Sequence, residues 1–144
     1  MTLDQQLMDS ALAGIRAALG SQPLIALNIL DNIVQSSLGK VDVGFPYKAV
    51  SFLRMVAYWN LQESADTAAR KAMEFGLESE AHVFKQRKLV YGELRAAEIA
   101  FYNGENLQAE GSFLLAEALA AGAGLRIGLS LQQLGEFYLW ARHL

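Results

Sequence analysis

The chain has 144 residues, a formal net charge of −3 and no cysteine. The absence of cysteine excludes disulfides, thiolate metal sites and a cysteine nucleophile, and the charge gives no basic surface for nucleic acid. The length predicts a single domain, 1–144, that buries its own core. Apolar residues make up 53% and charged residues 19% of the chain, against about 45–50% and 25% in ordinary globular domains. This surplus predicts apolar surface that contacts a partner protein or a second copy of the chain in a homodimer.

The first ten residues, MTLDQQLMDS, are partly acidic and polar, unlike the basic and then apolar start of a signal peptide. No stretch of about 18 uncharged apolar residues occurs, so no membrane span is expected. With cysteine also absent, we expect a cytoplasmic protein that does not contact a membrane.

Alanine, leucine, glutamine and glutamate are abundant and β-branched runs are scarce, which predicts an all-α fold. Pro23 and Pro46 are suited to the first turns of helices, Ser64 is suited to an N-cap, and Gly76 and Gly104 are suited to helix ends. Apolar residues at helical spacing complete the prediction. The expected helices are, in chain order, 3–19, 22–37, 46–61, 64–76, 80–102, 106–121 and 126–144.

Most connections between these seven helices are short, and 38–45 is the longest loop. Short connections make consecutive helices antiparallel neighbours. We therefore expect three helical hairpins, at about 3–37, 46–76 and 80–121, followed by a terminal helix at 126–144.

The third hairpin carries small residues and a turn glycine at fixed offsets from one alanine. The residues are Ala97, Gly104, Ala109, Phe113 and Ala116. This pattern resembles the tetratricopeptide repeat, and the same offsets around Ala26 and Ala65 match it in part. The resemblance covers roughly residues 3–121 and implies a right-handed α-solenoid with a concave groove lined by the first helix of each hairpin. A compact helical bundle or another α-solenoid is the alternative.

Residue patterns typical of catalysis or metal binding are missing from the sequence. His82 and His143 are far apart, and neither HExxH nor an Asp-rich calcium loop occurs. The glycine-rich stretch at 122–128, GAGLRIG, does not follow a strand pattern, so it is interpreted as a linker between helices rather than a phosphate-binding loop. We expect no enzyme activity, no cofactor and no metal.

Two helices supply candidate groove residues. In 80–102, Lys85, Lys88 and Arg95 share one face, and in 46–61 a polar strip contains Tyr47, Lys48 and Arg54 together with Ser51 and Tyr58. The tetratricopeptide resemblance implies that these residues line the concave groove and attract an acidic segment of a partner. An ordinary solvated helix face is the alternative interpretation of the three cations.

The last helix is crowded with large apolar side chains, Phe137, Tyr138, Leu139 and Trp140. These side chains point in several directions around a helix, so one neighbour does not cover them all. Either this end packs back across the molecule, or it docks onto another molecule, and we favour docking for Phe137, Tyr138 and Trp140.

Together these features predict a non-catalytic protein-interaction module, such as an adaptor, a chaperone or a regulatory subunit. One alternative is a helical ligand-binding or enzymatic bundle with a pocket among the aromatic residues of 46–61. Another is a regulatory or dimerisation domain of a bacterial transcription regulator that acts through a second chain.

Overall fold

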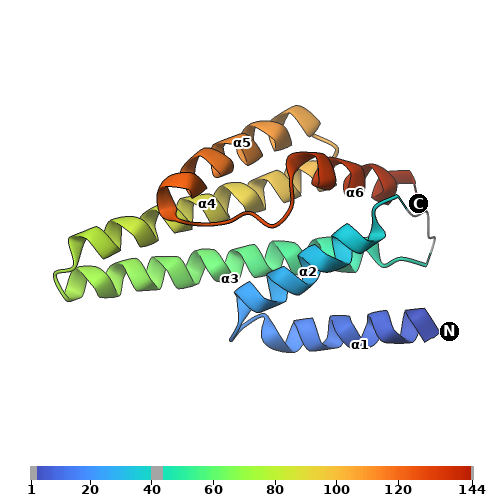
Figure 1. Ribbon diagram of the computed structural model, residues 1–144, viewed down its shortest axis with the longest axis horizontal. Coiled ribbons are helices and arrows are strands. Elements are labelled where there is room, and N and C mark those ends of the chain that lie inside the picture. Colours follow the sequence, from blue (N-terminus) through green and yellow to red (C-terminus); the bar gives the residue numbers. More distant parts are fainter. Residues whose placement is uncertain (1–2, 40–43, 144) are drawn as a thin grey trace.

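The computed structural model describes residues 3–39 and 44–143, and it confirms the all-α class. These residues form helices and connecting turns, without a strand (Figure 1). The helices are α1 (Leu3–Ala18), α2 (Pro23–Ser37), α3 (Tyr47–Glu74), α4 (Glu78–Tyr102), α5 (Asn106–Ala123) and α6 (Leu131–His143). Residues 40–43 of the predicted loop lie outside the described residues. No helix in the described part of the chain combines the length and the apolarity needed to cross a membrane.

The predicted helices 46–61 and 64–76 are one continuous helix, α3. Gln62, Glu63 and Ser64 contain neither proline nor glycine, and all three are compatible with a helix, so nothing stops it there. The prediction of a hairpin at 46–76 is therefore wrong, and the described residues form six helices instead of seven. α3 forms its long hairpin with α4, and α4 forms a second hairpin with α5.

Glycines end both long helices as predicted. Gly104 has a φ of 79° and Gly76 has a φ of 72°, values that glycine adopts without strain. After α4, the Glu105 N–H donates to the Ala100 carbonyl at 2.8 Å and the Gly104 N–H donates to the Phe101 carbonyl at 3.0 Å. This pair of bonds satisfies carbonyls that the helix end would leave open, and it turns the chain back toward α5.

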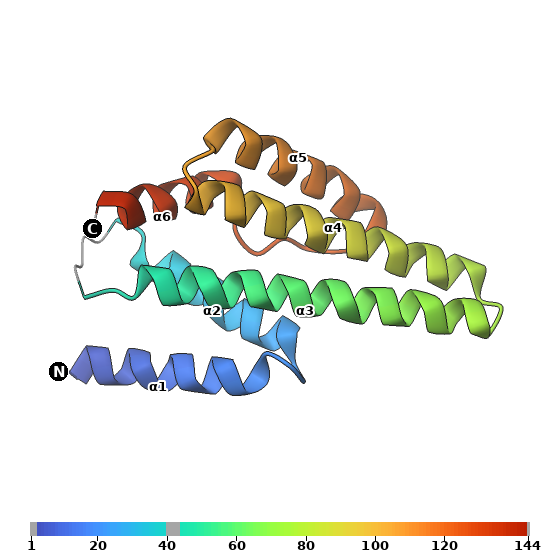
Figure 2. The same cartoon turned by 180° about the vertical axis from the view of Figure 1, so that it is seen from behind.

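Consecutive helices run in alternating directions, and α6 then returns across the array (Figures 1 and 2). α2 packs on α3, α1 packs mainly on α2, and α6 contacts α2, α4 and α5. Phe137 and Tyr138 of α6 are 0% and 1% exposed. The prediction that these two residues dock onto another molecule is wrong, because they fill the interior of their own chain, and Trp140 is also partly buried.

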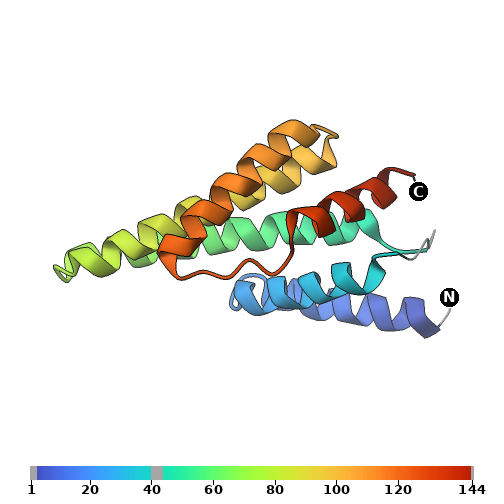
Figure 3. The same ribbon diagram turned by 45° about the horizontal axis from the view of Figure 1, so that its top comes forward.

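The far end of the α3–α4 hairpin projects beyond the other helices (Figures 1 and 3). The main hydrophobic core extends along α3 as far as Ala65 and resumes on α4 at Val90. Between these points the two helices bury only the small residues Ala69, Ala72 and Ala81. The hairpin end is therefore held by close helix–helix contact rather than by the core.

Candidate functional site

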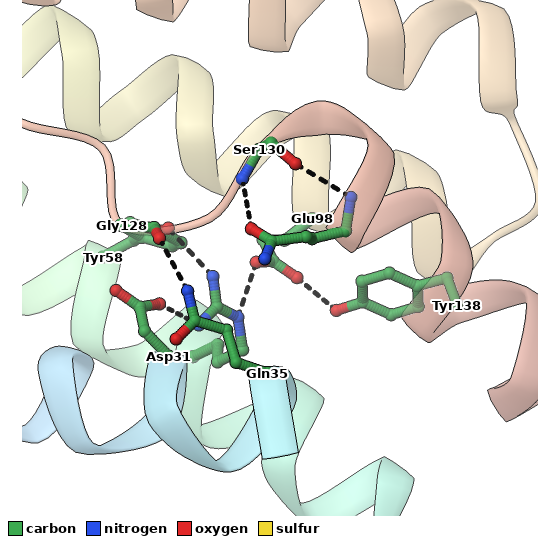
Figure 4. A network of polar contacts seen from close by, with 9 residues as sticks. Asp31, Gln35, Tyr58, Glu98, Gly128, Ser130 and Tyr138 are labelled. Atoms are coloured by element: carbon green, nitrogen blue, oxygen red, sulfur yellow. Dashed lines mark hydrogen bonds and ion pairs between the residues drawn. The ribbon is translucent and has the colours of Figure 1, made fainter. Parts of the chain in front are cut away.

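A fully buried arginine links three helices, and Figure 4 shows its partners Asp31, Tyr58 and Glu98 close together. Arg54 of α3 donates from Nε to Glu98 Oε1 of α4 at 2.7 Å and from Nη1 to Asp31 Oδ1 of α2 at 2.5 Å. Its Nη2 donates to the hydroxyl of Tyr58 at 3.1 Å. Charged hydrogen bonds of this kind are stronger than neutral ones and fix the directions of the side chains that make them.

The terminal helix joins the same network, since the Tyr138 hydroxyl of α6 donates to Glu98 Oε2. Burial alone would lower the pKa of Arg54, but the negative charges of Glu98 and Asp31 outweigh it and raise that pKa well above its ordinary value. Burial raises the pKa of Tyr58 and of Tyr138, so both phenols are neutral at neutral pH. The network therefore contains one guanidinium and two carboxylates, with a formal charge of −1.

The structure places Arg54 and Tyr47 inside the protein, although the sequence analysis assigned both to an exposed groove. Arg54 is 0% exposed and Tyr47 is 7% exposed, and Ser51 and Tyr58 of the same strip are buried as well. The expectation that this strip faces a groove is wrong, because α2, α4 and α6 cover it. Lys48 is exposed, but it lies in the first turn of α3, at the opposite end from the projecting hairpin end.

The sequence contains a signal for this network. Each charged member lies four residues after a buried apolar residue of its own helix and so shares the buried face. The pairs are Leu27 with Asp31, Val50 with Arg54, and Leu94 with Glu98. A charge on the apolar stripe of each of three helices indicates a buried ion network, since buried charges need partners.

A cavity of about 480 Å³ adjoins the network, between α2, α3, α4 and the linker 124–130. The linker is fixed to α2, because Gln35 Nε2 donates to the Gly128 carbonyl at 3.3 Å. A Cβ atom at position 128 would lie 2.1 Å from Asp31 Oδ2, so this close approach requires glycine. Residues 124–128 connect α5 to α6, as the sequence predicts for the stretch 122–128, whereas residues 122 and 123 are the end of α5.

An exposed surface on the α3–α4 hairpin contains the three cations of α4 that the sequence predicts to line a groove. Trp59, Asp66 and Met73 recur every seven residues on α3, and Lys85, Lys88 and Arg95 lie opposite them on α4. The guanidinium of Arg95 lies over the Trp59 ring, 4.5 Å from its centroid, and Lys88 Nζ lies 2.8 Å from Asp66 Oδ1. These six residues, with Leu89, are called the open hairpin face below.

The projecting end of the open hairpin face is hollowed into a groove of about 800 Å³. Its walls are Asp66, Ala69, Arg70, Met73, Glu74, Lys85, Lys88 and Leu89. Met73 is 48% exposed and Leu89 is 50% exposed, so the groove has apolar side chains among its charges.

The charges of this groove are three cations and two carboxylates, which leaves it formally positive. Asp66 pairs with both Lys88 and Arg70, and the hydrogen bond from Lys88 lowers the pKa of Asp66, which is therefore ionised at neutral pH. Lys85 is exposed and forms no ion pair within the described residues. It is the groove cation best placed to meet an outside carboxylate.

The chain matches no protein-family model, no curated protein and no solved structure. Across residues 3–39 and 44–143, no three or more histidine, aspartate or glutamate side chains gather closely enough to hold a metal ion. A function is therefore proposed from the chemistry of two places, the cavity beside the buried network and the open hairpin face.

Proposed function

We propose that the protein is a non-catalytic interaction module that binds a segment of a partner protein on the open hairpin face. The observation that carries the proposal is the groove at the projecting end, where Met73 and Leu89 are about half exposed beside Lys85. Half-exposed apolar residues gathered in one groove are typical of interaction surfaces. An adaptor, a chaperone or a regulatory subunit would use such a surface.

The partner segment that fits this groove is amphipathic and acidic. Apolar side chains of the partner would cover Met73 and Leu89 and supply most of the affinity, because exposed ion pairs contribute only about 0–1 kcal/mol each. A carboxylate of the partner would meet Lys85. Charges at the rim mainly set the orientation and the association rate, so binding would weaken as salt rises.

A tetratricopeptide-like stack is part of this proposal. It is supported by the alternating directions of consecutive helices and by the glycine-ended hairpin of α4 and α5 (Figure 2). In this arrangement the open hairpin face takes the place of the groove that the sequence analysis expected. A cytoplasmic location also belongs to the proposal, since it suits a chain without cysteine.

The test compares two identical substitutions at sites of equal exposure. Leu89→Glu alters the groove, and Leu114→Glu alters the outer side of α5, where the leucine is also 50% exposed. Immobilised wild-type and variant chains are incubated with an extract of the native organism, and captured proteins are quantified by mass spectrometry. We expect one partner to be captured by the wild type and by Leu114→Glu, and at least tenfold less by Leu89→Glu. Equal capture by all three chains would contradict the proposal.

Small-ligand binding is the second candidate function, and one observation favours it. Tyr58, an aromatic residue of α3, lines the cavity of about 480 Å³ next to the buried network. This volume lies within the range of about 300–1,000 Å³ that is usual for ligand pockets.

A further inference from the structure

We propose that the cavity between α2, α4 and the linker 124–130 binds a small organic cation, a primary ammonium group on a hydrocarbon body, and that Asp31 holds the ammonium. This inference does not depend on partner binding at the open hairpin face. It rests on an unpaired carboxylate oxygen, on the charge of the buried network and on the apolar walls of the cavity.

Asp31 presents one oxygen to Arg54 and the other away from it (Figure 4). Its side chain is 10% exposed, and it lines the cavity. Oδ2 has no hydrogen bond or ion pair within the part of the chain that the structure describes. A carboxylate oxygen only accepts hydrogen bonds, and the side chain that carries this one is largely buried. Gly128 lies close to Oδ2 on one side, and a donor in the cavity would supply the hydrogen-bond partner that this oxygen lacks.

The charge of the network favours a cationic donor over a neutral one. Arg54 balances only one of its two carboxylate partners, Asp31 and Glu98. Tyr58 and Tyr138 are neutral and do not change this sum. An uncompensated buried charge is unfavourable, and one bound monocation brings the formal charge of the network to zero.

Part of the remaining wall suits a hydrocarbon body, although Asn28, Asn32 and Gln35 also line the cavity. Leu27, Leu94 and Ile127 line the cavity from α2, α4 and the linker, together with Tyr91. Covering an apolar body contributes roughly 25 cal/mol for each Å² removed from water. The combination of apolar wall residues with one buried charged acceptor is what recognition of an alkyl or aryl amine requires.

Arg126 also lines the cavity, and its charge would oppose a cation. Arg126 is exposed, whereas Asp31 is buried. Solvent and salt screen an exposed charge far more effectively than a buried one. The buried carboxylate therefore sets the preference of the cavity, and Arg126 weakens it without reversing it.

The first experiment uses two probes of the same shape. Phenethylammonium and 2-phenylethanol are titrated into the full chain at pH 7 and low salt, and binding is measured by isothermal titration calorimetry. We expect the ammonium to bind at least tenfold more tightly than the alcohol. Equal affinities, or no binding of the ammonium, would overturn the proposal.

The second experiment locates the site without disturbing the ion network. Asn28 lines the mouth of the cavity, is exposed, and lies one helical turn before Asp31. In Asn28→Lys a tethered ammonium competes for the carboxylate, and phenethylammonium should bind at least tenfold more weakly. Ser36→Lys adds the same charge to an exposed position of α2 outside the cavity and should leave affinity unchanged. Wild-type affinity in Asn28→Lys, or an equal loss in both variants, would overturn the assignment.

Discussion

Arg54 binds two carboxylates and a phenol in the interior of the protein. Removing three charged groups from water is unfavourable, and the hydrogen bonds among them restore much of that free energy. The network is therefore a weak source of net stability, but a strong constraint on how α2, α3 and α4 fit together. A change that removes one member leaves the others buried without a partner.

Replacing Arg54 by methionine should destabilise the protein severely. Arg54→Met keeps most of the side-chain volume but leaves Glu98 and Asp31 buried without a cation, which costs about 3–5 kcal/mol. Urea unfolding followed by circular dichroism measures this loss. Lys48→Met removes an exposed cation from the same helix and should change the unfolding free energy by less than about 0.5 kcal/mol. Equal effects of the two substitutions would show that the buried network does not constrain the fold.

At the scale of single residues, part of the buried network could be predicted from the sequence. The spacing of Arg54 from Val50 places it on the buried face of its helix, and the same holds for Asp31 and Glu98. What the sequence lacks is the relative rotation of the helices, which decides whether three charges meet. The polar strip of α3 is buried although its polarity predicts exposure, because polar groups that pair with one another are readily buried.

Two helices end at the glycines that the sequence predicts to end them. Gly76 and Gly104 end α3 and α4 with positive φ, and Pro23 begins α2, as the sequence predicts. Ser64 did not begin a helix, because an N-cap serine acts only where the preceding chain is not helical. Residues 62–64 are compatible with either structure, so local sequence could not decide between one long helix and two short ones.

One substitution made at two glycines should have opposite effects on stability. Gly104→Ala places a side chain at a φ of 79° and should destabilise the fold by about 1 kcal/mol. Gly111 lies in α5, and an added Cβ would meet nothing within 4 Å. Gly111→Ala should therefore stabilise the fold by about 0.5–1 kcal/mol, because alanine favours a helix over glycine. Melting temperatures check both, and a shift of the same sign in the two variants would contradict the assigned turn.

The molecule is closed at one end and open at the other. α6 returns across α2, α4 and α5 and buries Phe137 and Tyr138, whereas the opposite end of the α3–α4 hairpin extends beyond the core (Figure 3). The sequence showed that the apolar residues of the last helix needed cover, but not which surface would supply it. That choice depends on the path of the linker 124–130, which is fixed by contacts with α2 far away in the sequence.

The predicted cations lie on the open hairpin face, but the continuous α3 changes what lies beside them. Because α3 does not fold back at residue 62, its second half pairs with α4 and brings Met73 into the same groove as Lys85. The groove is thus a property of the whole hairpin, of which the sequence predicts only the cations on α4. Its position, away from the main core, suits contact with another protein.

The most direct test of partner binding at the projecting end is site-specific photo-crosslinking in cells of the native organism. A benzophenone amino acid replaces Leu89 in the groove, or, as the control, Leu107 at the start of α5, which is 87% exposed. Both probes are accessible, so only the location differs. We predict that irradiation joins the Leu89 probe to one specific partner and that the Leu107 probe gives no such adduct. A partner captured at Leu107 and absent at Leu89 would contradict the assignment of the interaction surface to the hairpin end.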